Sequence, residues 1–357
     1  MALPKLATER LFSEFLPLMG WSDEQEHFFS RFSDAFGARC GFFARTYLLG
    51  LLLPGERKSV EPMSARLGVP YDPLHRFVND APWDDRHVLA PLRGLVGEWA
   101  AGAAERFAVF DDTGLPKQGK HSVGVQRQYS GTLGKTGNCQ IAVGMAFGWG
   151  NASHHQAVPA GWRLYLPESW LADPVRREKS HIPADSTLRT KWELALEILD
   201  ESVEDGLKPD FVLADCGYGD REFRQALRER RLPYALGVNP SRCKVLDERV
   251  VVRPTGRGRL QAVGHETAVE VTTLLTEMNE QTWTRVEWRH GLAADFHRRT
   301  VRLMLKGAPT DEVCELVLER RKNGDLKAHL VWGMDGASLP EIAERLHRRW
   351  LVEQVFQ

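Results

Sequence analysis

Through residues 1–100, apolar residues recur every three or four positions, which is the spacing of one helix face. Residues 22–36 begin with Ser22, and Gln25 follows three positions later, a combination that predicts a capped helix start. Residues 40–53 form a more apolar stretch that ends at a Pro-Gly pair and predicts another helix. We therefore expect a helical N-terminal domain over residues 1–100.

Two short apolar runs in this domain, residues 63–67 and 74–78, flank the turn Gly68-Val69-Pro70. This arrangement predicts a small helix–turn–helix. Such a pair either packs as a plain helical unit, which its spacing favours, or inserts one helix into DNA. The N-terminal domain is therefore a candidate DNA-binding domain.

From residue 105 the pattern changes to short apolar or alternating runs that predict strands. Strands come first, and helices then alternate with strands as far as residue 240. That order predicts an α/β domain, over residues 101–240, built on a mixed sheet with flanking helices. The expected strands are residues 106–110, 121–129, 139–147, 163–166, 211–214 and 234–238, and the expected helices are residues 188–203 and 220–230.

Residues 241–334 differ again, because short strands are separated by polar and glycine-containing turns. We interpret this region as a β-rich insertion between the sheet and a last helix. The expected strands are residues 250–252, 269–271, 283–288, 301–305 and 330–332.

The last segment, residues 335–357, has a clear helix start at Ser338-Leu339-Pro340-Glu341, a capping box with proline in the first turn. Ile342, Leu346 and Glu353 then recur at helical spacing. The sequence therefore predicts that Glu353 lies on the buried stripe of this helix, where a carboxylate needs a partner or a metal ion.

Composition limits the functions that depend on overall charge or on a membrane. The chain has 357 residues and a formal net charge of −1, so no global field attracts a polyanion. DNA contacts would have to come from local basic clusters, each of which is more often an ordinary solvated face. The clusters lie at residues 228–231, 253–259, 297–299, 320–322 and 347–349.

Several features together predict a cytoplasmic protein that does not enter membranes. The five cysteines are scattered without Cys-x-x-Cys pairs, which is typical of a reducing compartment. The N-terminus has no signal-peptide apolar region, and the longest apolar stretch, residues 47–53, is too short to span a bilayer.

Three carboxylates could carry chemistry. Asp111 follows the apolar run at residues 107–110, Asp215 follows the run at residues 211–214, and Glu353 lies on the last helix. Two strand-end aspartates and a helical glutamate suit a two-metal phosphoryl-transfer site, because Mg²⁺ prefers carboxylates, water and phosphate oxygens. The chain has 48 acidic residues, so spacing alone explains each aspartate equally well as a turn or helix-cap residue.

The residues that follow Asp111 carry a specific resemblance. Residues 111–135, which begin Asp-Asp-Thr-Gly, and the run Asn138-Cys139-Gln140 resemble the DDE transposases of bacterial insertion sequences, in the group of DDE superfamily endonucleases. Shorter matches to that group lie at residues 57–63, 80–84, 214–219 and 349–354.

This resemblance implies a catalytic and metal-binding set of Asp111, Asp215 and Glu353, with Asp112 as the second choice for the first aspartate. It implies an RNase H-like core interrupted by a β-rich insertion, which agrees with the order of elements above. It also implies a transposase that depends on Mg²⁺, with Mn²⁺ as a substitute. Such an enzyme cuts phosphodiester bonds at element ends and joins the 3′-hydroxyl ends to target DNA.

The resemblance implies partners as well, namely double-stranded DNA of the terminal inverted repeats and of the target, bound by a homodimer. Arg349 matches an arginine of the family's signature, whereas Leu346 stands where the signature has tyrosine. The residues expected to contact DNA are Lys117, Lys120, Arg127 and Arg349.

Two other classes of function are possible. Residues 131–137 suggest a phosphate-binding loop, but Tyr129 stands where that motif requires glycine.

The transposase family's signature has a lysine seven positions after the glutamate, which would lie beyond Gln357. A truncated or domesticated transposase that acts only as a DNA-binding protein is therefore the alternative.

Two aromatic residues and two histidines also have competing explanations. Trp283 and Trp288 could stack on bases of distorted DNA, but cross-strand core packing is the favoured explanation. His154 and His155 have no partners at metal-ligand spacing, so we expect them in a loop.

Overall fold

The computed structural model describes residues 22–131, 134–151, 154–247, 268–276, 278, 280–289, 291–305 and 308–356. The strand predicted at residues 250–252 lies outside them. The chain divides into two compact units, Met1–Leu95 and Val96–Gln357. Among the described helices, none is both long enough and apolar enough to cross a membrane.

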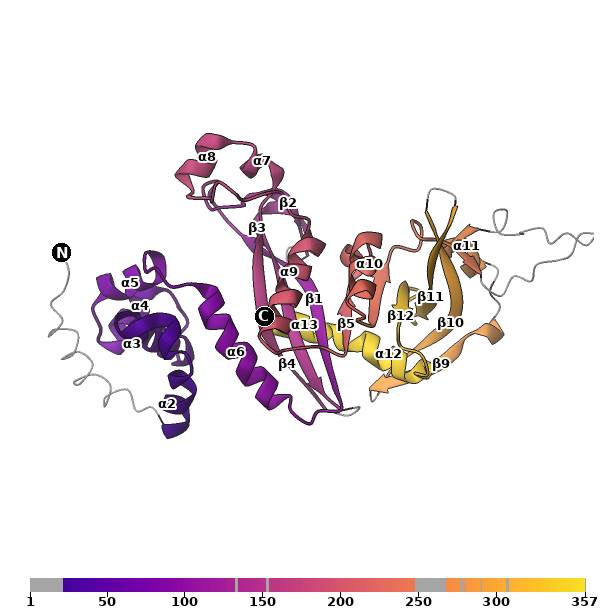
Figure 1. The fold of residues 1–357 in the computed structure, drawn as a ribbon, viewed down its shortest axis with the longest axis horizontal. Coiled ribbons are helices and arrows are strands. Elements are labelled where there is room, and N and C mark those ends of the chain that lie inside the picture. The colour runs from indigo at the N-terminus through magenta and orange to yellow at the C-terminus, as the bar shows by residue number, and fades with distance from the viewer. Residues whose placement is uncertain are drawn as a thin grey trace, which may run out of the picture. The chain divides into compact units, whose positions relative to one another are not determined.

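The described part of the N-terminal unit consists of helices joined by short connections (Figure 1). Ser22 caps the first of them as predicted: its hydroxyl accepts a hydrogen bond from the Gln25 N–H at 3.3 Å, and the Gln25 side chain accepts one from the Ser22 N–H at 2.9 Å. The helices are α2 (Asp23–Ser30), α3 (Ser33–Leu52), α4 (Val60–Leu67) and α5 (Tyr71–Asn79), and α6 (Asp85–Trp99) continues into the second unit.

The single helix expected over residues 22–36 is divided in two. Helix α2 ends at Ser30, and α3 begins at Ser33 and kinks at Gly37, whose φ of 62° lies in the left-handed region that favours glycine. Helix α3 then continues through the helix expected over residues 40–53 and ends at Leu52. The break between Ser30 and Ser33 therefore divides the first expected helix, and the kink at Gly37 separates its second part from the helix expected over residues 40–53.

Helices α4 and α5 form the pair that the sequence predicts around Gly68. Gly68 ends α4 with a φ of 64°, again in the left-handed region. Met63, Val69 and Leu74 pack together in the pair, against Tyr47 of α3. The pair is thus a packed helical unit, and a DNA-binding role for it stays a prediction.

The described residues of the second unit form a mixed sheet of 12 strands, which confirms the predicted mixed α/β class. The hydrogen-bonded order is β2-β3-β1-β5-β6-β12-β11-β10-β7-β8, with β4 beside β3 and β9 beside β10. Strands β1, β5 and β6 are mutually parallel, and the other described pairings are antiparallel. The strands are β1 (Glu105–Pro116), β2 (Gln126–Ser130), β3 (Lys135–Gly150), β4 (His155–Tyr165), β5 (Phe211–Ala214), β6 (Tyr234–Val238), β7 (Lys244–Asp247), β8 (Val269–Glu270), β9 (Thr284–Arg289), β10 (Leu292–Leu305), β11 (Ala308–Arg320) and β12 (Leu326–Trp332).

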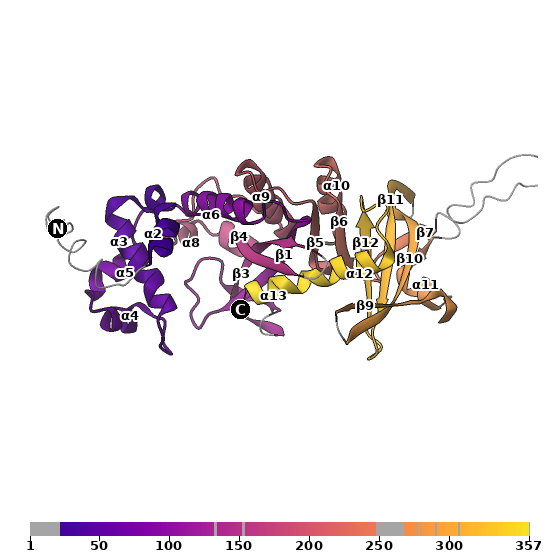
Figure 2. The same cartoon turned by 90° about the horizontal axis from the view of Figure 1, so that it is seen from below.

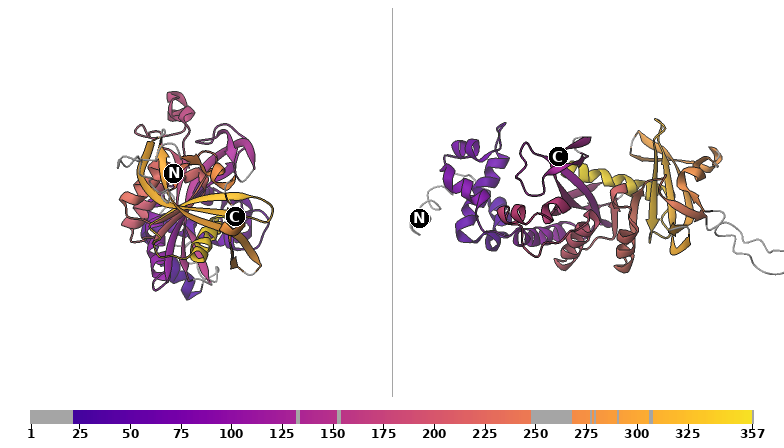
Figure 3. Two further views of the ribbon diagram at one scale, coloured as in Figure 1. Left: turned by 90° about the vertical axis from the view of Figure 1, so that its right-hand side faces the viewer. Right: turned by 90° about the horizontal axis from the view of Figure 1, so that it is seen from above.

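Helices cover both faces of this sheet (Figures 2 and 3). Phe107 and Val109 of β1 pack in one core with Val352, on the side of the C-terminal helices. Phe110 points the other way, and its ring centroid lies 6.3 Å from that of Phe223. On the first face lie α12 (Leu339–His347) and α13 (Leu351–Val355), and on the second lie α9 (Lys191–Glu204) and α10 (Arg221–Glu229). The other helices are α7 (Glu168–Leu171), α8 (Pro174–Lys179) and α11 (Val271–Thr276), with 3₁₀ turns η2 (Cys216–Tyr218), η3 (Glu280–Thr282) and η4 (Arg348–Trp350).

Two expected strands are shorter than predicted. Of residues 121–129, only the part from Gln126 onward is a strand, and the preceding residues form turns. In these turns Gly124 has a φ of 78°, and a Cβ there would lie 2.9 Å from the Tyr165 carbonyl oxygen. The alternating valines before Gln126 therefore belong to a turn that glycine makes possible. The strand expected at residues 269–271 ends after two residues, where α11 begins.

The last helical segment differs from its prediction at one residue. The capping box at Ser338 forms as predicted, and Ile342 and Leu346 are buried. The chain then passes through the tighter turn η4 before α13, which rotates the later residues relative to an α-helical stripe. The prediction that Glu353 lies on the buried stripe is therefore wrong, because its side chain is 60% exposed.

Candidate active site

Asp111 lies within a strand, whereas the sequence predicted it at the end of one. Strand β1 pairs with β3 on both sides of Asp111, which lies opposite Gly144. The parallel pairing of β1 with β5 stops at Phe110 and Ala214. The residue that follows each of these in the chain is an aspartate, so Asp111 of β1 and Asp215, just after β5, come together where β5 ends.

The alternation of side chains along β1 distinguishes the two neighbouring aspartates. Asp111 shares the face of Phe107 and Val109, which is covered by the C-terminal helices. Asp112 points to the opposite face, where Lys191 Nζ lies 2.8 Å from its Oδ2. Of the two, Asp111 is therefore the one on the same face as the helix that carries Glu353.

A tight turn that rests on the neighbouring strand fixes the position of Asp215. Its Oδ1 accepts a hydrogen bond from the Gly217 N–H at 2.8 Å. Gly237 of β6 lies directly beneath the turn, because a Cβ at this position would be 2.8 Å from the Cys216 backbone nitrogen and 3.0 Å from the Asp215 carbonyl carbon. The glycine therefore allows the turn to approach the sheet.

Arg349 connects the aspartate of the sheet to the glutamate of the helix. Its Nη1 lies 2.9 Å from Asp111 Oδ2, and its Nη2 lies 3.2 Å from Glu353 Oε1. The Arg349 and Asp111 side chains are 25% and 19% exposed. A single guanidinium thus contacts two of the three carboxylates that the sequence predicts to be catalytic.

The two aspartates repel each other in a partly buried site. Burial and the nearby Asp215 charge raise the pKa of Asp111 to about 6, and Arg349 only partly opposes this. Asp111 also accepts a hydrogen bond from the Asp112 N–H at 2.8 Å. Arg349 therefore neutralises only part of the negative charge of the site.

This donor set suits a hard divalent cation. Carboxylate oxygens are the ligands that Mg²⁺ prefers, and the excess negative charge at Asp111 and Asp215 would favour its binding. Across the described residues, however, no three His, Cys, Asp or Glu side chains converge in an arrangement ready to hold a metal ion. Glu353 pairs with Arg349 instead. The chemistry of the residues fits Mg²⁺, and Arg349 occupies the position between two of them.

Two residues near the site gave no clear signal in the sequence. Lys327 is the second residue of β12, beside the end of β6. Desolvation lowers the pKa of Lys327, the charge of Arg349 acts in the same direction, and that of Glu353 opposes it. Tyr218 is fully buried, and the charges of the nearby aspartates reach its hydroxyl, which has no hydrogen-bond partner in the described structure. A lysine in a strand and a tyrosine in a turn are too common to be noticed without the fold.

The other residues predicted to contact DNA are exposed. Lys117 and Lys120 follow β1, and Arg127 lies on β2. Arg349 differs from these three, because it already contacts acidic side chains.

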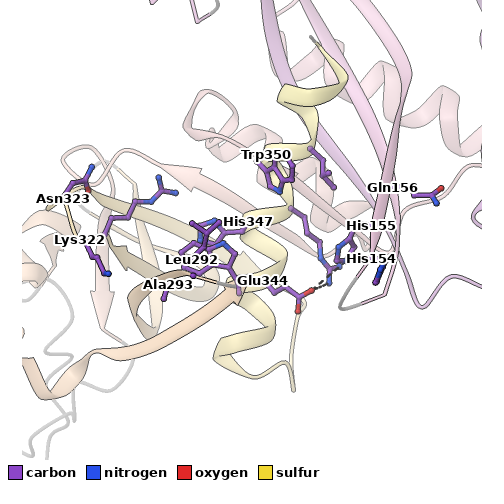
Figure 4. Close-up of a pocket in the computed structure, with 15 residues that line it drawn as sticks. His154, His155, Gln156, Leu292, Ala293, Lys322, Asn323, Glu344, His347 and Trp350 are labelled. Carbon is purple, nitrogen blue, oxygen red and sulfur yellow. Dashed lines mark hydrogen bonds and ion pairs between the residues drawn. The ribbon is translucent and has the colours of Figure 1, made fainter.

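A hollow of about 980 Å³ lies beside the C-terminal helices (Figure 4). Helix α12 and turn η4 contribute His347 and Trp350, the β3–β4 connection contributes His154, and Lys322 comes from the β11–β12 turn. His155 also lines the hollow, but it is the first residue of β4 and pairs with Gly150, so the loop expected for both histidines is wrong for His155. Cationic, imidazole and aromatic groups line this open concavity together with the acidic Glu344, and the cationic and aromatic groups suit nucleic acid.

The two tryptophans of the predicted insertion have packing partners, as the favoured interpretation expects. Trp288 stacks on His347 with ring centroids 3.6 Å apart and planes 1° from parallel. The Arg320 guanidinium lies 4.6 Å from the centre of the Trp283 ring. Trp288 also packs edge-to-face on Phe296 of the neighbouring strand β10, with ring centroids 5.9 Å apart, and it lines the hollow.

The interpretation of residues 131–137 as a phosphate-binding loop is wrong. Strands β2 and β3 form an antiparallel hairpin in which Ser130 pairs with Lys135, whereas a phosphate-binding loop joins a strand to a helix. Residues 132 and 133, between Gly131 and Gly134 in the hairpin connection, lie outside the described residues.

Comparison with known proteins agrees with the resemblance of the sequence. The family described as DDE superfamily endonuclease matches residues 29–295. The chain is 28% identical over 208 residues to a probable transposase for insertion sequence element IS701 from Microchaete diplosiphon, which covers 55% of this chain. The chain spans 49% of that relative's length. A distant similarity to the NurA nuclease from Sulfolobus solfataricus has a TM-score of 0.29 and 11% identity, over 71% of this chain and 77% of that one.

Proposed function

Because this chain belongs to the DDE superfamily endonuclease family, we propose that it is a transposase that cuts DNA at the ends of an insertion sequence. It then joins the freed 3′-hydroxyl ends to target DNA. The catalytic residues are Asp111, Asp215 and Glu353. The observation that carries this assignment is the parallel pairing of β1 with β5, which brings Asp111 and Asp215 together on the face covered by the helix of Glu353.

The order of strands supports an RNase H-like core. Strands β1, β3 and β4 form an antiparallel series, and β5 and β6 follow as parallel additions on the other side of β1, each after a helix. The two aspartates then come from the two adjacent parallel strands, β1 and β5. Such a scaffold holds carboxylates rigidly, which favours a defined catalytic geometry.

Bound Mg²⁺, or Mn²⁺ in its place, would activate water and stabilise the leaving oxygen. The chain's own residues hold and orient the reactants. Strand β1 fixes Asp111, the turn at Asp215 fixes the second carboxylate, and Arg349 carries a charged fork that suits a phosphate. Lys117 and Lys120 are exposed and would contact the DNA backbone.

The proposed partners are the terminal inverted repeats, target DNA and a second copy of the chain. The hollow lined by His347, Trp350 and Lys322 supports a nucleic-acid partner, because it combines positive charge with stacking surfaces. Action on chromosomal or plasmid DNA would take place in the cytoplasm.

A nicking assay on DNA that contains the element ends tests the function. With Mg²⁺ or Mn²⁺, wild type should cleave, and Asp111→Asn and Asp215→Asn should each lose more than about a hundredfold, since even the supporting partners of metal ligands change activity by 10–100-fold. Asp112→Asn is the matched control, because it removes the same charge one residue away on the opposite face of β1. It should retain most activity.

Two outcomes would contradict the proposal in different ways. DNA binding without cleavage by wild type would favour a protein that only binds DNA. Equal loss in Asp112→Asn and Asp111→Asn would mean that β1 does not distinguish a catalytic aspartate.

A further inference from the structure

We infer that Arg349 is an internal counter-ion that competes with the metal ion for the carboxylates of Asp111 and Glu353. A DNA phosphate would attract its guanidinium and leave these carboxylates to the metal ion. This rests on the proposed function, because it assumes that Asp111 and Glu353 bind a divalent cation. It adds that metal binding and DNA binding are coupled through one side chain.

The geometry places the guanidinium between the carboxylates. Its two terminal nitrogens go to different acids, Nη1 to Asp111 at 2.9 Å and Nη2 to Glu353 at 3.2 Å. A metal ion shared by these carboxylates needs their oxygens and would bring more positive charge to the same position. The guanidinium and the metal ion therefore compete for Asp111 and Glu353.

Burial makes this competition significant. The Asp111 side chain is only 19% exposed and has the like charge of Asp215 beside it. A counter-charge is worth more there than at an open surface, because water screens it less. Glu353, at 60% exposure, is the weaker of the two contacts. Asp111 is thus the main anchor of Arg349.

The neighbouring Arg348 is a buried arginine of the same segment that makes structural ion pairs, and it serves as a comparison for Arg349. Arg348 is 6% exposed and pairs with both Glu105 and Glu344 away from the aspartates. Arg349 is four times as exposed, at 25%, and lies at the rim of the site. Its side chain can therefore move from carboxylate to phosphate without unpacking the core.

The expected consequence is a thermodynamic coupling. When DNA removes Arg349 from Asp111, the affinity for the metal ion rises, and by reciprocity the metal ion raises the affinity for DNA by the same factor. Without DNA, the guanidinium stays on Asp111 and Glu353, and the protein should therefore bind the metal ion more weakly.

Titration of the DNA-free protein with Mn²⁺, followed by electron paramagnetic resonance of the free ion, tests this without measuring catalysis. Arg349→Ala should bind Mn²⁺ at least about fivefold more tightly than wild type, the low end of typical couplings between sites. Arg349→Lys should fall between them, because lysine keeps the charge but lacks the fork that reaches both acids. A short duplex should increase Mn²⁺ affinity more in wild type than in Arg349→Ala.

Arg345→Ala is the matched control, since it removes the same charge from the same segment but pairs with Glu105. Its Mn²⁺ affinity should equal that of wild type. If wild type binds Mn²⁺ in a way that Asp111→Asn abolishes, yet Arg349→Ala and Arg349→Lys bind it no more tightly, the counter-ion role is overturned and the metal site stands. If no variant binds Mn²⁺ through Asp111, both the counter-ion role and the proposed metal site fail.

Discussion

At the scale of single residues, the site is defined by an unfavourable electrostatic interaction. Asp111 and Asp215 are like charges held together by backbone pairing, and burial and repulsion raise the pKa of Asp111 to about 6. Active sites commonly keep such strain, which costs stability and serves function.

The repulsion between Asp111 and Asp215 predicts that a substitution which removes activity, Asp111→Asn, stabilises the fold. In the presence of EDTA at about pH 8, Asp111→Asn should raise the free energy of unfolding by roughly 1–2 kcal/mol, because it removes a partly buried charge that its surroundings disfavour. Urea unfolding measures this. Asp112→Asn should instead leave stability unchanged or lower it, since Asp112 has Lys191 as an ion-pair partner. A less stable Asp111→Asn protein would mean that Arg349 more than offsets the repulsion.

At the scale of secondary structure, glycine on one strand determines where the second aspartate lies. The turn at Asp215 touches β6 at Gly237, where any side chain would meet backbone atoms at 2.8 and 3.0 Å. Backbone cannot yield as a flexible side chain can, so a methyl group here must displace the turn.

Gly237→Ala should therefore reduce DNA nicking by about a hundredfold, since a shift of about 1 Å is enough for such a loss. It should also lower the free energy of unfolding by about 1–3 kcal/mol through overpacking. Gly119→Ala is the control, because a Cβ at that glycine meets nothing within 4 Å. Full activity of Gly237→Ala would indicate that the Asp215 turn is not held by β6.

The elements also explain which parts of the site could be predicted. The apolar runs before Asp111 and Asp215 predicted two strands correctly, because buried parallel strands have continuous apolar sequence. Their pairing could not be predicted from local pattern, since paired residues such as Phe107 and Phe211 are 104 positions apart in the sequence. Helical spacing misplaced Glu353, because a 3₁₀ turn depends on tertiary packing and leaves no periodic signal. Arg349 was found through the resemblance, but its contact with Asp111 needed the fold.

At the scale of the whole second unit, a buried polar cluster lies on the same sheet near the candidate site. Glu319 of β11 is almost fully buried, and neighbouring His347 and Arg321 lower its pKa to about 2 despite burial. Burial lowers the pKa of His329 on β12 to about 4, and the charges of Lys327, His347 and Arg349 act in the same direction, against that of Glu319. Two adjacent strands thus carry groups that resist protonation in the folded state.

Both groups make the second unit sensitive to acid. Between pH 6.5 and 4 the unfolded chain protonates His329 and the folded chain does not, so the free energy of unfolding falls as pH decreases. From pH 7 to 5 this one residue should contribute a loss of about 2 kcal/mol. Glu319 adds a further loss as pH falls from 4.5 towards 2, where its folded carboxylate finally takes up a proton.

Urea unfolding across this range measures both effects. Between pH 7 and 5 the free energy of unfolding should decrease less for His329→Gln than for wild type, and below pH 4.5 it should depend less on pH for Glu319→Gln. Identical slopes for wild type and His329→Gln between pH 7 and 5 would show that other groups cause the acid sensitivity.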